Sequence, residues 1–346
     1  MQALVLVGGK GTRLRPLTET VPKPVLRLVD RPFIADMIEW LAGHGVEEVL
    51  LACGFLPDAL REVLGDGEPG GPRLRYLTEP EPRGTAGAIK FAEAELEDRF
   101  LALNGDTLTD LDLTALVHAH EAHDARATLA LHPVEDPSAY GLVRTGPEGE
   151  VLEFLEKPES GAPDPGAGNE INAGAYVLER SLLEMVPPDR AVSIERDVFP
   201  RLVGQGLYGL RLEGYWMDIG TPDRYLQASW DILEGRVETR VAVGPDGVRV
   251  DPGADLGGAR VEGPVFADDG ARAETGARIG PDAVLGRDCR VSAGAEIRRS
   301  VLLDGCDVGA DATVEDSILG PGAAVEAGAK VRGAVEGEAA RVPPSE

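Results

Sequence analysis

The residues best suited to chemistry lie at the start of the chain, in the stretch MQALVLVGGKGTRLRPLT. Five apolar residues, Ala3 to Val7, run directly into a glycine-rich loop that carries Lys10, Arg13 and Arg15. Glycines let backbone N–H groups approach an anion closely, and arginine adds a forked, permanently charged donor. The loop therefore has the chemistry of a phosphate-binding site at the carboxyl end of a strand.

Two familiar phosphate-binding patterns do not fit this loop. A Walker-type loop requires G-x-x-x-x-G-K-[ST], but Gly11 is followed by Thr12 and Arg13. A dinucleotide-binding fingerprint requires G-x-G-x-x-G, and Leu14 stands where its third glycine belongs. Taken alone, the loop fits a strand-to-helix turn with solvated charges equally well, so other residues have to decide.

Two aspartates and two lysines further along the chain suit the same chemistry. Asp106 follows an apolar strand in LNGDTL, and Asp218 stands in YWMDIGTP. A Mg²⁺ ion that serves a nucleotide takes one or two carboxylates in addition to phosphate oxygens and water. Lys23 and Lys157 each precede a proline, which biases them toward an extended backbone. Each residue alone fits an ordinary turn or an exposed loop, and only together do they favour a phosphate site.

The composition restricts the possible partners. The 346 residues carry a net charge of −26, which argues against binding to nucleic acid or to an anionic membrane. Arginine strongly outnumbers lysine among the 34 basic residues, so the few lysines are suggestive of phosphate contacts. The three cysteines form no C-x-x-C pair, and no apolar run suits a signal peptide or a membrane span. We expect a soluble, cytoplasmic protein.

Strand-like and helix-like segments alternate up to about residue 235. This alternation predicts an α/β fold, with a mostly parallel, Rossmann-like sheet and flanking helices. Ligands of such sheets bind beyond the carboxyl ends of the strands, where both the opening loop and Asp106 lie. The expected strands are residues 2–7, 46–53, 99–103, 126–134 and 150–155, and the expected helices are 32–45, 85–98 and 111–124.

After residue 250 the pattern changes to a hexapeptide repeat. Aliphatic residues recur every six positions, with two five-residue steps, and Gly, Ala, Asp and Pro lie between them. This repeat is the signature of a parallel β-helix, which we interpret as a stacking module that joins subunits into a homo-oligomer. The expected organisation is a catalytic domain at 1–238, a linker at 239–250, the β-helix at 251–335 and a disordered tail at 336–346. The repeated positions are Ile279, Leu285, Val291, Ile297, Leu302, Val308, Val314, Leu319, Val325 and Val331.

Eight short motifs in a fixed order give the chain a family resemblance. They are GGKGTRLRPLT (8–18), PKP (22–24), GTAGA (84–88), NGD (104–106), YGLV (140–143), EKP (156–158), INAG (171–174) and WMDIGTP (216–222). With them the chain resembles the sugar-phosphate nucleotidyltransferases, and its β-helix resembles that of the longer members, which winds left-handed. The resemblance is greatest to members that make GDP-mannose, particularly in GTAGA, SIERDVFP (193–200) and the β-helix.

The resemblance implies a single displacement, in which the phosphate of a sugar 1-phosphate attacks the α-phosphorus of a nucleoside triphosphate and pyrophosphate leaves. It implies that Asp106 and Asp218 hold Mg²⁺ and that Lys157 holds the sugar phosphate. Glu156, Asn172 and the backbone at Gly141 are expected to meet sugar hydroxyls. The residues expected to bind the nucleotide are Gly8, Gly9, Gly11, Thr12, Arg13, Lys23, Glu79, Gly84 and Thr85.

The segment LTEPEPRGTAG resembles the part of the family fold that reads the base edge, so the base is inferred from its Glu79. A carboxylate accepts hydrogen bonds only, and guanine offers two adjacent donors, its N1–H and 2-amino groups. Glu79 therefore favours guanine and GTP, although Glu81 competes for this role. Transfer to glucose 1-phosphate from UTP or dTTP is the alternative, and a catalytically inactive regulatory subunit is a further one.

Two other readings are less favoured. The histidines of HAHEAH (118–123) suggest a metal site, but on a helix His118 and His120 point roughly 200° apart. We expect a solvated helix face there. An acyltransferase of the β-helix type would require a histidine base, and every histidine precedes the repeats.

Overall fold

The computed structural model describes residues 1–54, 56–155 and 169–344. The chain divides into two compact units. Unit 1 comprises Met1–Gly9 and Met37–Trp216, and unit 2 comprises Lys10–Asp36 and Met217–Glu346. Unit 2 therefore combines a short segment from the start of the chain with the whole repeat region.

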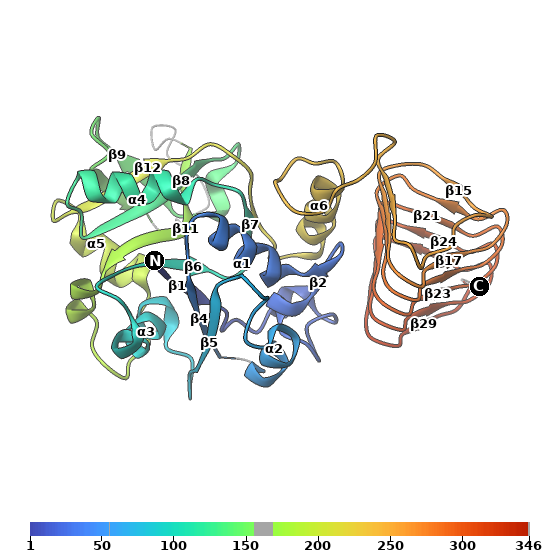
Figure 1. Ribbon diagram of the computed structural model, residues 1–346, viewed down its shortest axis with the longest axis horizontal. Coiled ribbons are helices and arrows are strands. Elements are labelled where there is room, and N and C mark those ends of the chain that lie inside the picture. The colour runs from blue at the N-terminus through green and yellow to red at the C-terminus, as the bar shows by residue number, and fades with distance from the viewer. Residues whose placement is uncertain (55, 156–168, 345–346) are drawn as a thin grey trace. The chain divides into compact units, whose positions relative to one another are not determined.

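Unit 1 is built on one nine-stranded sheet (Figure 1). Its main strand order is β10-β9-β11-β6-β1-β4-β5, with β8 paired to β11 and β12 paired to β8. The strands are β1 (Gln2–Leu6), β4 (Glu48–Cys53), β5 (Arg73–Thr78), β6 (Arg99–Asn104), β8 (Ala127–Pro133), β9 (Leu142–Thr145), β10 (Val151–Leu155), β11 (Glu170–Glu179) and β12 (Leu207–Arg211).

Four neighbouring strands of this sheet, β6, β1, β4 and β5, run parallel. In their register Leu6 pairs with both Ala52 and Asn104, so the residues that follow these strands meet at one edge. Strands β1, β4 and β6 read as nearly continuous apolar runs because helices cover both faces. The expected α/β sheet is confirmed, and β11 adds an antiparallel strand beside β6 that the sequence pattern did not predict.

Helices cover the sheet of unit 1 (Figure 1). Asp112 caps α4 by accepting a hydrogen bond from the Ala115 N–H at 3.0 Å. The helix expected at 85–98 ends early, and a 3₁₀ turn follows it. The helices are α1 (Phe33–Gly43), which crosses the boundary between the units, α2 (Pro57–Leu64), α3 (Gly84–Phe91), α4 (Leu113–Ala122) and α5 (Phe199–Leu202). Shorter turns are η3 (Glu93–Glu95), η4 (Pro137–Ala139), η5 (Arg180–Met185) and the π-helix η6 (Ile194–Val198).

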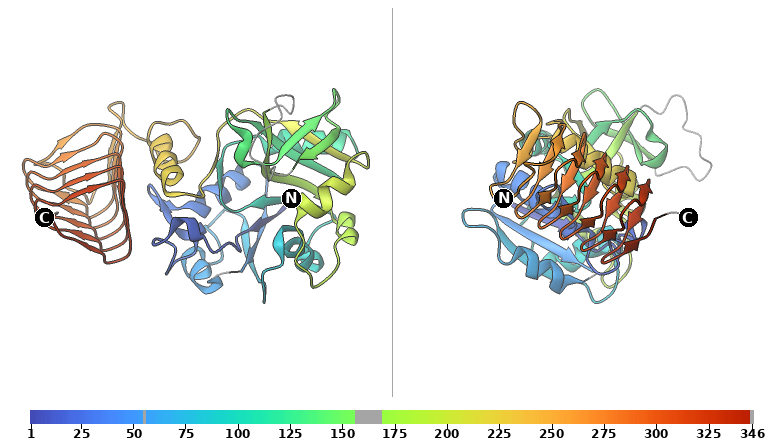
Figure 2. Two further views of the ribbon diagram at one scale, coloured as in Figure 1. Left: turned by 180° about the vertical axis from the view of Figure 1, so that it is seen from behind. Right: turned by 90° about the vertical axis from the view of Figure 1, so that its right-hand side faces the viewer.

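In the repeat region of unit 2, the strands of successive coils stack into three parallel sheets (Figure 2), consistent with the left-handed β-helix expected for the repeats. Val265 pairs with Ala283, eighteen residues on, and Ala283 pairs with Ser300, seventeen residues on, so a five-residue step shortens one coil. All ten repeated aliphatic residues lie in one buried core.

The strands of the β-helix fall into three groups. The first sheet contains β14 (Val248–Val250), β16 (Val265–Ala267), β19 (Ala283–Leu285), β22 (Ser300–Leu302), β25 (Ile318–Leu319) and β28 (Val335–Glu336). The second contains β15 (Arg260–Val261), β18 (Arg278–Ile279), β21 (Glu296–Arg298), β24 (Thr313–Glu315) and β27 (Lys330–Arg332). The third contains β17 (Arg272–Ala273), β20 (Arg290–Val291), β23 (Asp307–Val308), β26 (Ala324–Val325) and β29 (Arg341–Val342). Strand β14 begins within the expected linker, and β29 lies where we expected a disordered tail.

The middle strands of the first sheet of the β-helix, β16, β19, β22 and β25, are buried on both faces. Its inward residues belong to the core, and the outward Phe266, Val284, Val301 and Ile318 are buried as well. Helix α6 (Pro222–Leu233) packs against β22 and covers part of this outward face. The second sheet instead carries outward charges, such as the Arg278–Glu296 ion pair.

The segment of unit 2 that comes from the start of the chain is short and irregular. It contains the 3₁₀ turns η1 (Thr12–Leu14) and η2 (Lys23–Val25) and a hairpin of β2 (Arg27–Leu28) and β3 (Arg31–Pro32). Strands β7 (Thr107–Thr109) and β13 (Trp216–Asp218) complete the described elements.

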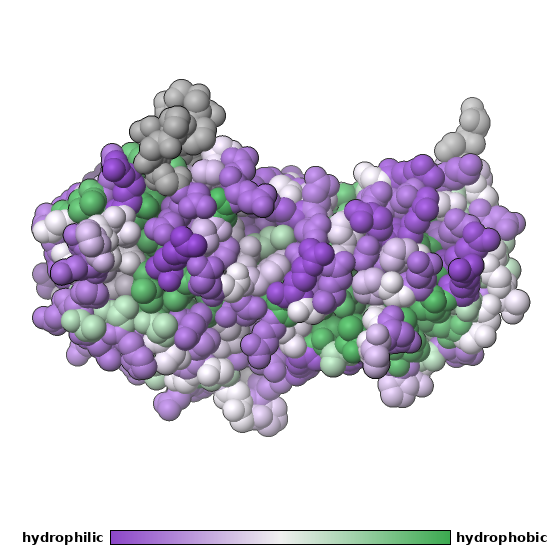
Figure 3. Space-filling view, turned by 90° about the horizontal axis from the view of Figure 1, so that it is seen from above, coloured by the Kyte–Doolittle hydropathy of each residue, from purple (hydrophilic) through white to green (hydrophobic). Residues whose placement is uncertain are grey.

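The described residues form no helix that is both long and apolar enough to cross a membrane. On the face shown in Figure 3, polar residues predominate and hydrophobic residues form smaller patches.

Candidate active site

Three strand ends of unit 1 meet around the first glycines of the opening loop. A Cβ atom added to Gly54, which follows β4, would lie 3.0 Å from the Gly8 carbonyl oxygen. A Cβ atom added to Gly8 would lie 3.5 Å from Oε1 of Glu79, which follows β5. The backbones therefore pass close together, and Gly8 faces the Glu79 carboxylate.

Glu79 is held in place and largely removed from water. Its side chain is only 9% exposed, and its Oε2 accepts a hydrogen bond from the Arg83 N–H at 3.2 Å. Burial raises the pKa of the Glu79 carboxyl above its ordinary value, and the Arg83 N–H partly offsets this. Glu81 is exposed, so of the two candidates Glu79 is the one beside Gly8.

The GTAGA motif opens helix α3 and is anchored to a second segment of unit 1. Gly84 has φ +69°, and a Cβ atom on it would lie 2.7 Å from the Val192 carbonyl oxygen. The Thr85 hydroxyl donates to Glu195 at 2.8 Å and accepts from the Ile194 N–H at 2.8 Å. The Thr85 side chain therefore uses its hydroxyl to bind the π-helical turn within SIERDVFP. Its expected role at the nucleotide stays a prediction.

Asp106 follows strand β6 at the same edge of the sheet. The Gly105 N–H donates to the Leu6 carbonyl at 2.9 Å. A Cβ atom on Gly105 would lie 2.6 Å from a Val7 methyl carbon, so only glycine brings the NGD turn this close to the end of β1. Asp106 is half-buried there.

The residues expected at the sugar also come together within unit 1. The Asn172 N–H donates to the Gly141 carbonyl at 3.0 Å. The Asn172 side chain bonds locally, to the Tyr176 hydroxyl at 2.9 Å and the Gly174 N–H at 3.0 Å, where β11 bulges. Trp216 lies beside them, with its Nε1–H donating to the Ala173 carbonyl at 2.8 Å. The sequence alone could not place this tryptophan.

In unit 2, the remainder of the opening loop turns sharply at Gly11. This residue has φ +58°, and its carbonyl accepts a hydrogen bond from the Thr18 hydroxyl at 2.7 Å. Buried Leu14 anchors the 3₁₀ turn that follows, whereas Thr12 and Arg13 remain exposed. The loop is thus fixed at its base and presents its polar side chains outward.

Three cationic side chains of unit 2 lie around Asp218. Lys23 Nζ lies 3.9 Å from Asp218 Oδ1, and Lys23 is only 8% exposed. Arg224, in the first turn of α6, places Nη1 3.3 Å from Asp218 Oδ2. A Cβ atom on Gly220 would lie 2.5 Å from Arg13 Nη2, so the guanidinium lies directly on this glycine. Three positive charges thus gather at one place in unit 2, which suits a polyphosphate.

Arg224 was not among the residues predicted from the sequence. Its only signal is its place at the start of a helix six residues after Asp218, which no phosphate motif specifies. Glu156 and Lys157, expected at the sugar and its phosphate, lie outside the described residues.

The histidines of residues 118–123 need a correction. His120 is fully buried rather than solvated, and it bonds to Thr128 at 2.9 Å and Glu179 at 3.1 Å. Burial lowers the pKa of His120, and the Glu179 hydrogen bond opposes this. His123 stacks on Tyr208. Across the described ranges, no group of three or more His, Cys, Asp and Glu residues forms a metal cluster.

Two family models match successive parts of the chain. Residues 2–235 match the family described as Nucleotidyl transferase, and residues 261–345 match the GMPPB C-terminal domain. Mannose-1-phosphate guanylyltransferase of Mycobacterium tuberculosis is 37% identical over 309 residues, which cover 88% of this chain and 80% of that protein. UTP–glucose-1-phosphate uridylyltransferase of Synechocystis is 31% identical, with coverage of 88% and 83%.

A solved structure extends the likeness to the fold. HddC from Yersinia pseudotuberculosis, crystallised in complex with GMP-PN, has a TM-score of 0.58 and 28% identity. The match covers 67% of this chain and 99% of HddC. With a family match over well over half of its length and relatives similar along most of it, the chain belongs to the nucleotidyl transferase family.

Proposed function

We propose that this chain makes GDP-mannose and pyrophosphate from GTP and mannose 1-phosphate. The observation that carries the proposal is the cluster of three cationic side chains around Asp218, namely Arg13, Lys23 and Arg224. The similar guanylyltransferases and the buried carboxylate of Glu79 support the choice of substrates.

The reaction is a displacement at phosphorus. A phosphate oxygen of the sugar 1-phosphate forms a bond to the α-phosphorus, and the bond from that phosphorus to the β-phosphate oxygen breaks. Catalysis of such a step consists mainly of positioning the reactants and neutralising charge. Arg13 and Lys23 bind the triphosphate and neutralise the pyrophosphate as it leaves, and the N–H groups of Gly8, Gly9 and Gly11 add donors.

Asp106 and Asp218 are the residues that would hold a divalent cation, which we propose is Mg²⁺. Asp106 follows β6 and Asp218 ends β13, both carboxylates keep some exposure, and oxygen ligands of this kind suit Mg²⁺. When bound, such an ion would neutralise negative charge on the phosphates. Asp218 also orients Lys23 and Arg224 through its ion pairs.

Glu79 selects the base in this proposal. Its carboxylate accepts hydrogen bonds from the N1–H and 2-amino groups of guanine, and these donors replace the hydration that burial removes. On the sugar side, Gly141, Asn172 and Glu156 meet hydroxyls and Lys157 holds the phosphate, as the family resemblance implies.

A substrate grid tests the proposal. Pyrophosphate release is measured for mannose, glucose, galactose and N-acetylglucosamine 1-phosphates with GTP, ATP, UTP, dTTP and CTP, each with Mg²⁺ and with EDTA. We expect a maximum for mannose 1-phosphate with GTP that EDTA abolishes. A maximum for glucose 1-phosphate with UTP, the activity named for the Synechocystis relative, would overturn the choice of substrates. No turnover at all would overturn the enzyme assignment.

We also propose that the chain forms a homo-oligomer through its β-helix. Within the described part of the chain, β27, β28 and β29 each end their sheet, and a second copy would cover these edges. Light scattering on the purified protein would show a multiple of the chain mass of 36.5 kDa. A monomeric mass would contradict this proposal and leave the enzymatic one intact.

A further inference from the structure

Arg27 lies in unit 2, four residues after Lys23, on strand β2. The two residues share one rigid piece of backbone, because the Leu26 N–H closes the 3₁₀ turn onto the Lys23 carbonyl at 3.0 Å. Leu26 and Leu28, on either side of Arg27, are buried. A displacement of Arg27 therefore carries over to the backbone that mounts Lys23.

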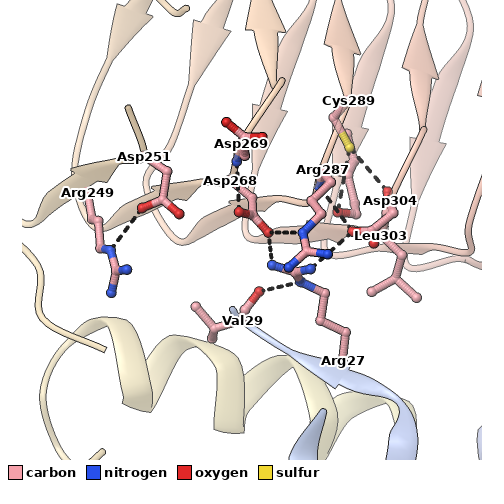
Figure 4. A network of polar contacts seen from close by, with 11 residues as sticks. Arg27, Val29, Arg249, Asp251, Asp268, Asp269, Arg287, Cys289, Leu303 and Asp304 are labelled. Carbon is pink, nitrogen blue, oxygen red and sulfur yellow. Dashed lines mark hydrogen bonds and ion pairs between the residues drawn. The ribbon is translucent and has the colours of Figure 1, made fainter. Parts of the chain in front are cut away.

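The side chain of Arg27 leaves this segment and reaches the β-helix (Figure 4). Its guanidinium pairs with Asp268, which follows β16, and lies 3.4 Å from Asp304, which follows β22. Its Nε–H donates to the Val29 carbonyl at 3.0 Å. One guanidinium thus bridges two coils of the β-helix and its own hairpin.

Asp268 has few alternatives to Arg27 for neutralising its charge. Its side chain is 6% exposed, and it accepts a hydrogen bond from the Asp269 N–H at 2.7 Å. Arg287 lies further away, at 3.5 Å, and its own side chain is 62% exposed. A buried carboxylate requires a charged partner close by, so separating Arg27 from Asp268 would cost free energy.

A second connection joins Arg27 to the other side of the phosphate site. The Tyr225 hydroxyl donates to the Arg27 carbonyl, and Tyr225 is almost fully buried. Its neighbour in α6, Arg224, pairs with Asp218. The backbone of Arg27 is therefore tied to the helix that begins just after Asp218, and its side chain is tied to the β-helix.

Apolar packing alone does not fix the position of the segment that carries Lys23. A small cavity lies between the start-of-chain segment and α6, with Lys23, Leu26 and Tyr225 among its lining residues. Side chains beside a cavity lose contacts on one side and can shift into the space. The polar ties of Arg27 restrict such a shift.

We propose that Arg27 is a positioning residue through which Asp268 and Asp304 of the β-helix hold Lys23 in place opposite Asp218. The β-helix then takes part in handling the triphosphate, in addition to any role in assembly. This inference rests on the proposed function only in taking Lys23 and Asp218 as the groups that meet the nucleotide phosphates.

The test compares R27A, R27K, D268N and D304N with the wild-type full-length chain. For each variant we would measure kcat, KM for each substrate, the melting temperature, and binding of a non-hydrolysable nucleotide by calorimetry. R278A is the matched control, because it breaks a β-helix ion pair at 2.9 Å on the outward face of the second sheet.

We expect R27A and D268N to lower kcat/KM for the nucleotide by about 10- to 100-fold, since misplacement of a catalytic group by about 1 Å has effects of this size. Nucleotide binding should weaken, and KM for the sugar 1-phosphate should change much less. D304N should have a smaller effect, because Asp304 is half-exposed and its contact is longer. R27K should recover part of the loss, and R278A should behave like the wild type.

Two outcomes would overturn the inference. In the first, R27A and D268N lower the melting temperature but leave both KM values, kcat and nucleotide binding unchanged at a temperature where they are folded. In the second, R278A shows the same kinetic loss as R27A. If R27A does not fold, D304N and R27K carry the test. Both variants keep a positive charge at position 27 beside the buried Asp268 carboxylate. Absence of turnover in the wild type would count against the proposed function instead.

Discussion

At the scale of single residues, Glu79 combines burial with a place beside the glycines that end β1. The E79Q variant keeps the shape and removes the charge, so one of the two guanine donors loses its acceptor. We expect the preference for GTP over UTP to fall by about 10- to 100-fold, the size expected for a hydrogen bond to a charged group. The ratio of kcat/KM values for the two nucleotides measures it.

E81Q is the matched control, because Glu81 is exposed and two residues away. It should leave the ratio at the wild-type value. An unchanged ratio in E79Q would show that another group reads the base.

Glu79 also predicts a dependence of stability on pH. Its pKa is raised in the folded protein, so above the ordinary glutamate value of 4.5 the folded state binds more protons than the unfolded state. Stability is therefore lost as the pH rises through the raised folded pKa. E79Q lacks this loss and should melt at a higher temperature than the wild type at pH 7, with the difference smaller at pH 4. Thermal melts of both proteins at the two pH values check it, and an equal difference at both pH values would contradict it.

At the scale of elements, the pattern that repeats is the part best predicted from sequence. Each aliphatic residue of the hexapeptide repeat, such as Ile279 or Val308, points into the same core, so every coil supports the same interpretation. The apolar runs of β1, β4 and β6 are similarly clear because both faces of a parallel sheet are covered. Strand β11 was not predicted because Asn172 and Gly174, at its bulge, are residue types more typical of loops than of strands.

The supporting residues of the site could not be predicted, because they act across long separations in the chain. Glu195 meets Thr85, 110 residues earlier, and Asp268 meets Arg27, 241 residues earlier. Nothing in the local sequence distinguishes such a glutamate or aspartate from a solvated one. The motifs, in contrast, marked Lys23 and Asp218 because several short patterns occur in order.

The contact between Thr85 and Glu195 gives a prediction at this scale. T85V removes the hydroxyl and leaves the Glu195 carboxylate and the Ile194 N–H without this partner. The start of α3 should then shift, and KM for the nucleotide should rise by about 10-fold while KM for the sugar 1-phosphate stays nearly constant. Steady-state kinetics with each substrate varied in turn measure both values.

T114V is the control for this change, because Thr114 bonds to His44 on the surface of α4. E195Q, which keeps one acceptor, should fall between T85V and the wild type. Equal increases in both KM values in T85V would point to a general loosening of unit 1 rather than to the nucleotide side.

At the scale of the whole molecule, the compact units do not follow the family boundaries. The nucleotidyl transferase match ends at residue 235, yet residues 10–36 belong to the same unit as the β-helix. HddC is matched over 99% of its length by 67% of this chain, so the fold exists elsewhere as a shorter protein. In the present chain the segment that carries Arg13 and Lys23 makes polar contacts with the repeats, such as the pair of Arg27 with Asp268.

A shortened chain that ends at residue 245, before β14, tests whether residues 10–36 need the β-helix to hold their geometry. A large hydrophobic cluster of the nine-stranded sheet draws only on unit 1, so the sheet should still form. Without Asp268 and Asp304, Arg27 has lost both acceptors in the β-helix, and α6 exposes the face that met β22. We expect a lower melting temperature and a KM for the nucleotide raised at least as much as in R27A.

The decisive comparison adds R27A to this shortened chain. If Arg27 acts through the β-helix, the substitution has no further effect on KM for the nucleotide once the β-helix is gone, because the two changes remove the same interaction. In the full-length chain the same substitution should raise this KM. Additive effects would mean that the Arg27 side chain supports Lys23 through its hydrogen bond to the Val29 carbonyl of its own hairpin. A shortened chain with wild-type kinetics would mean that the phosphate-handling segment holds its geometry without the repeats.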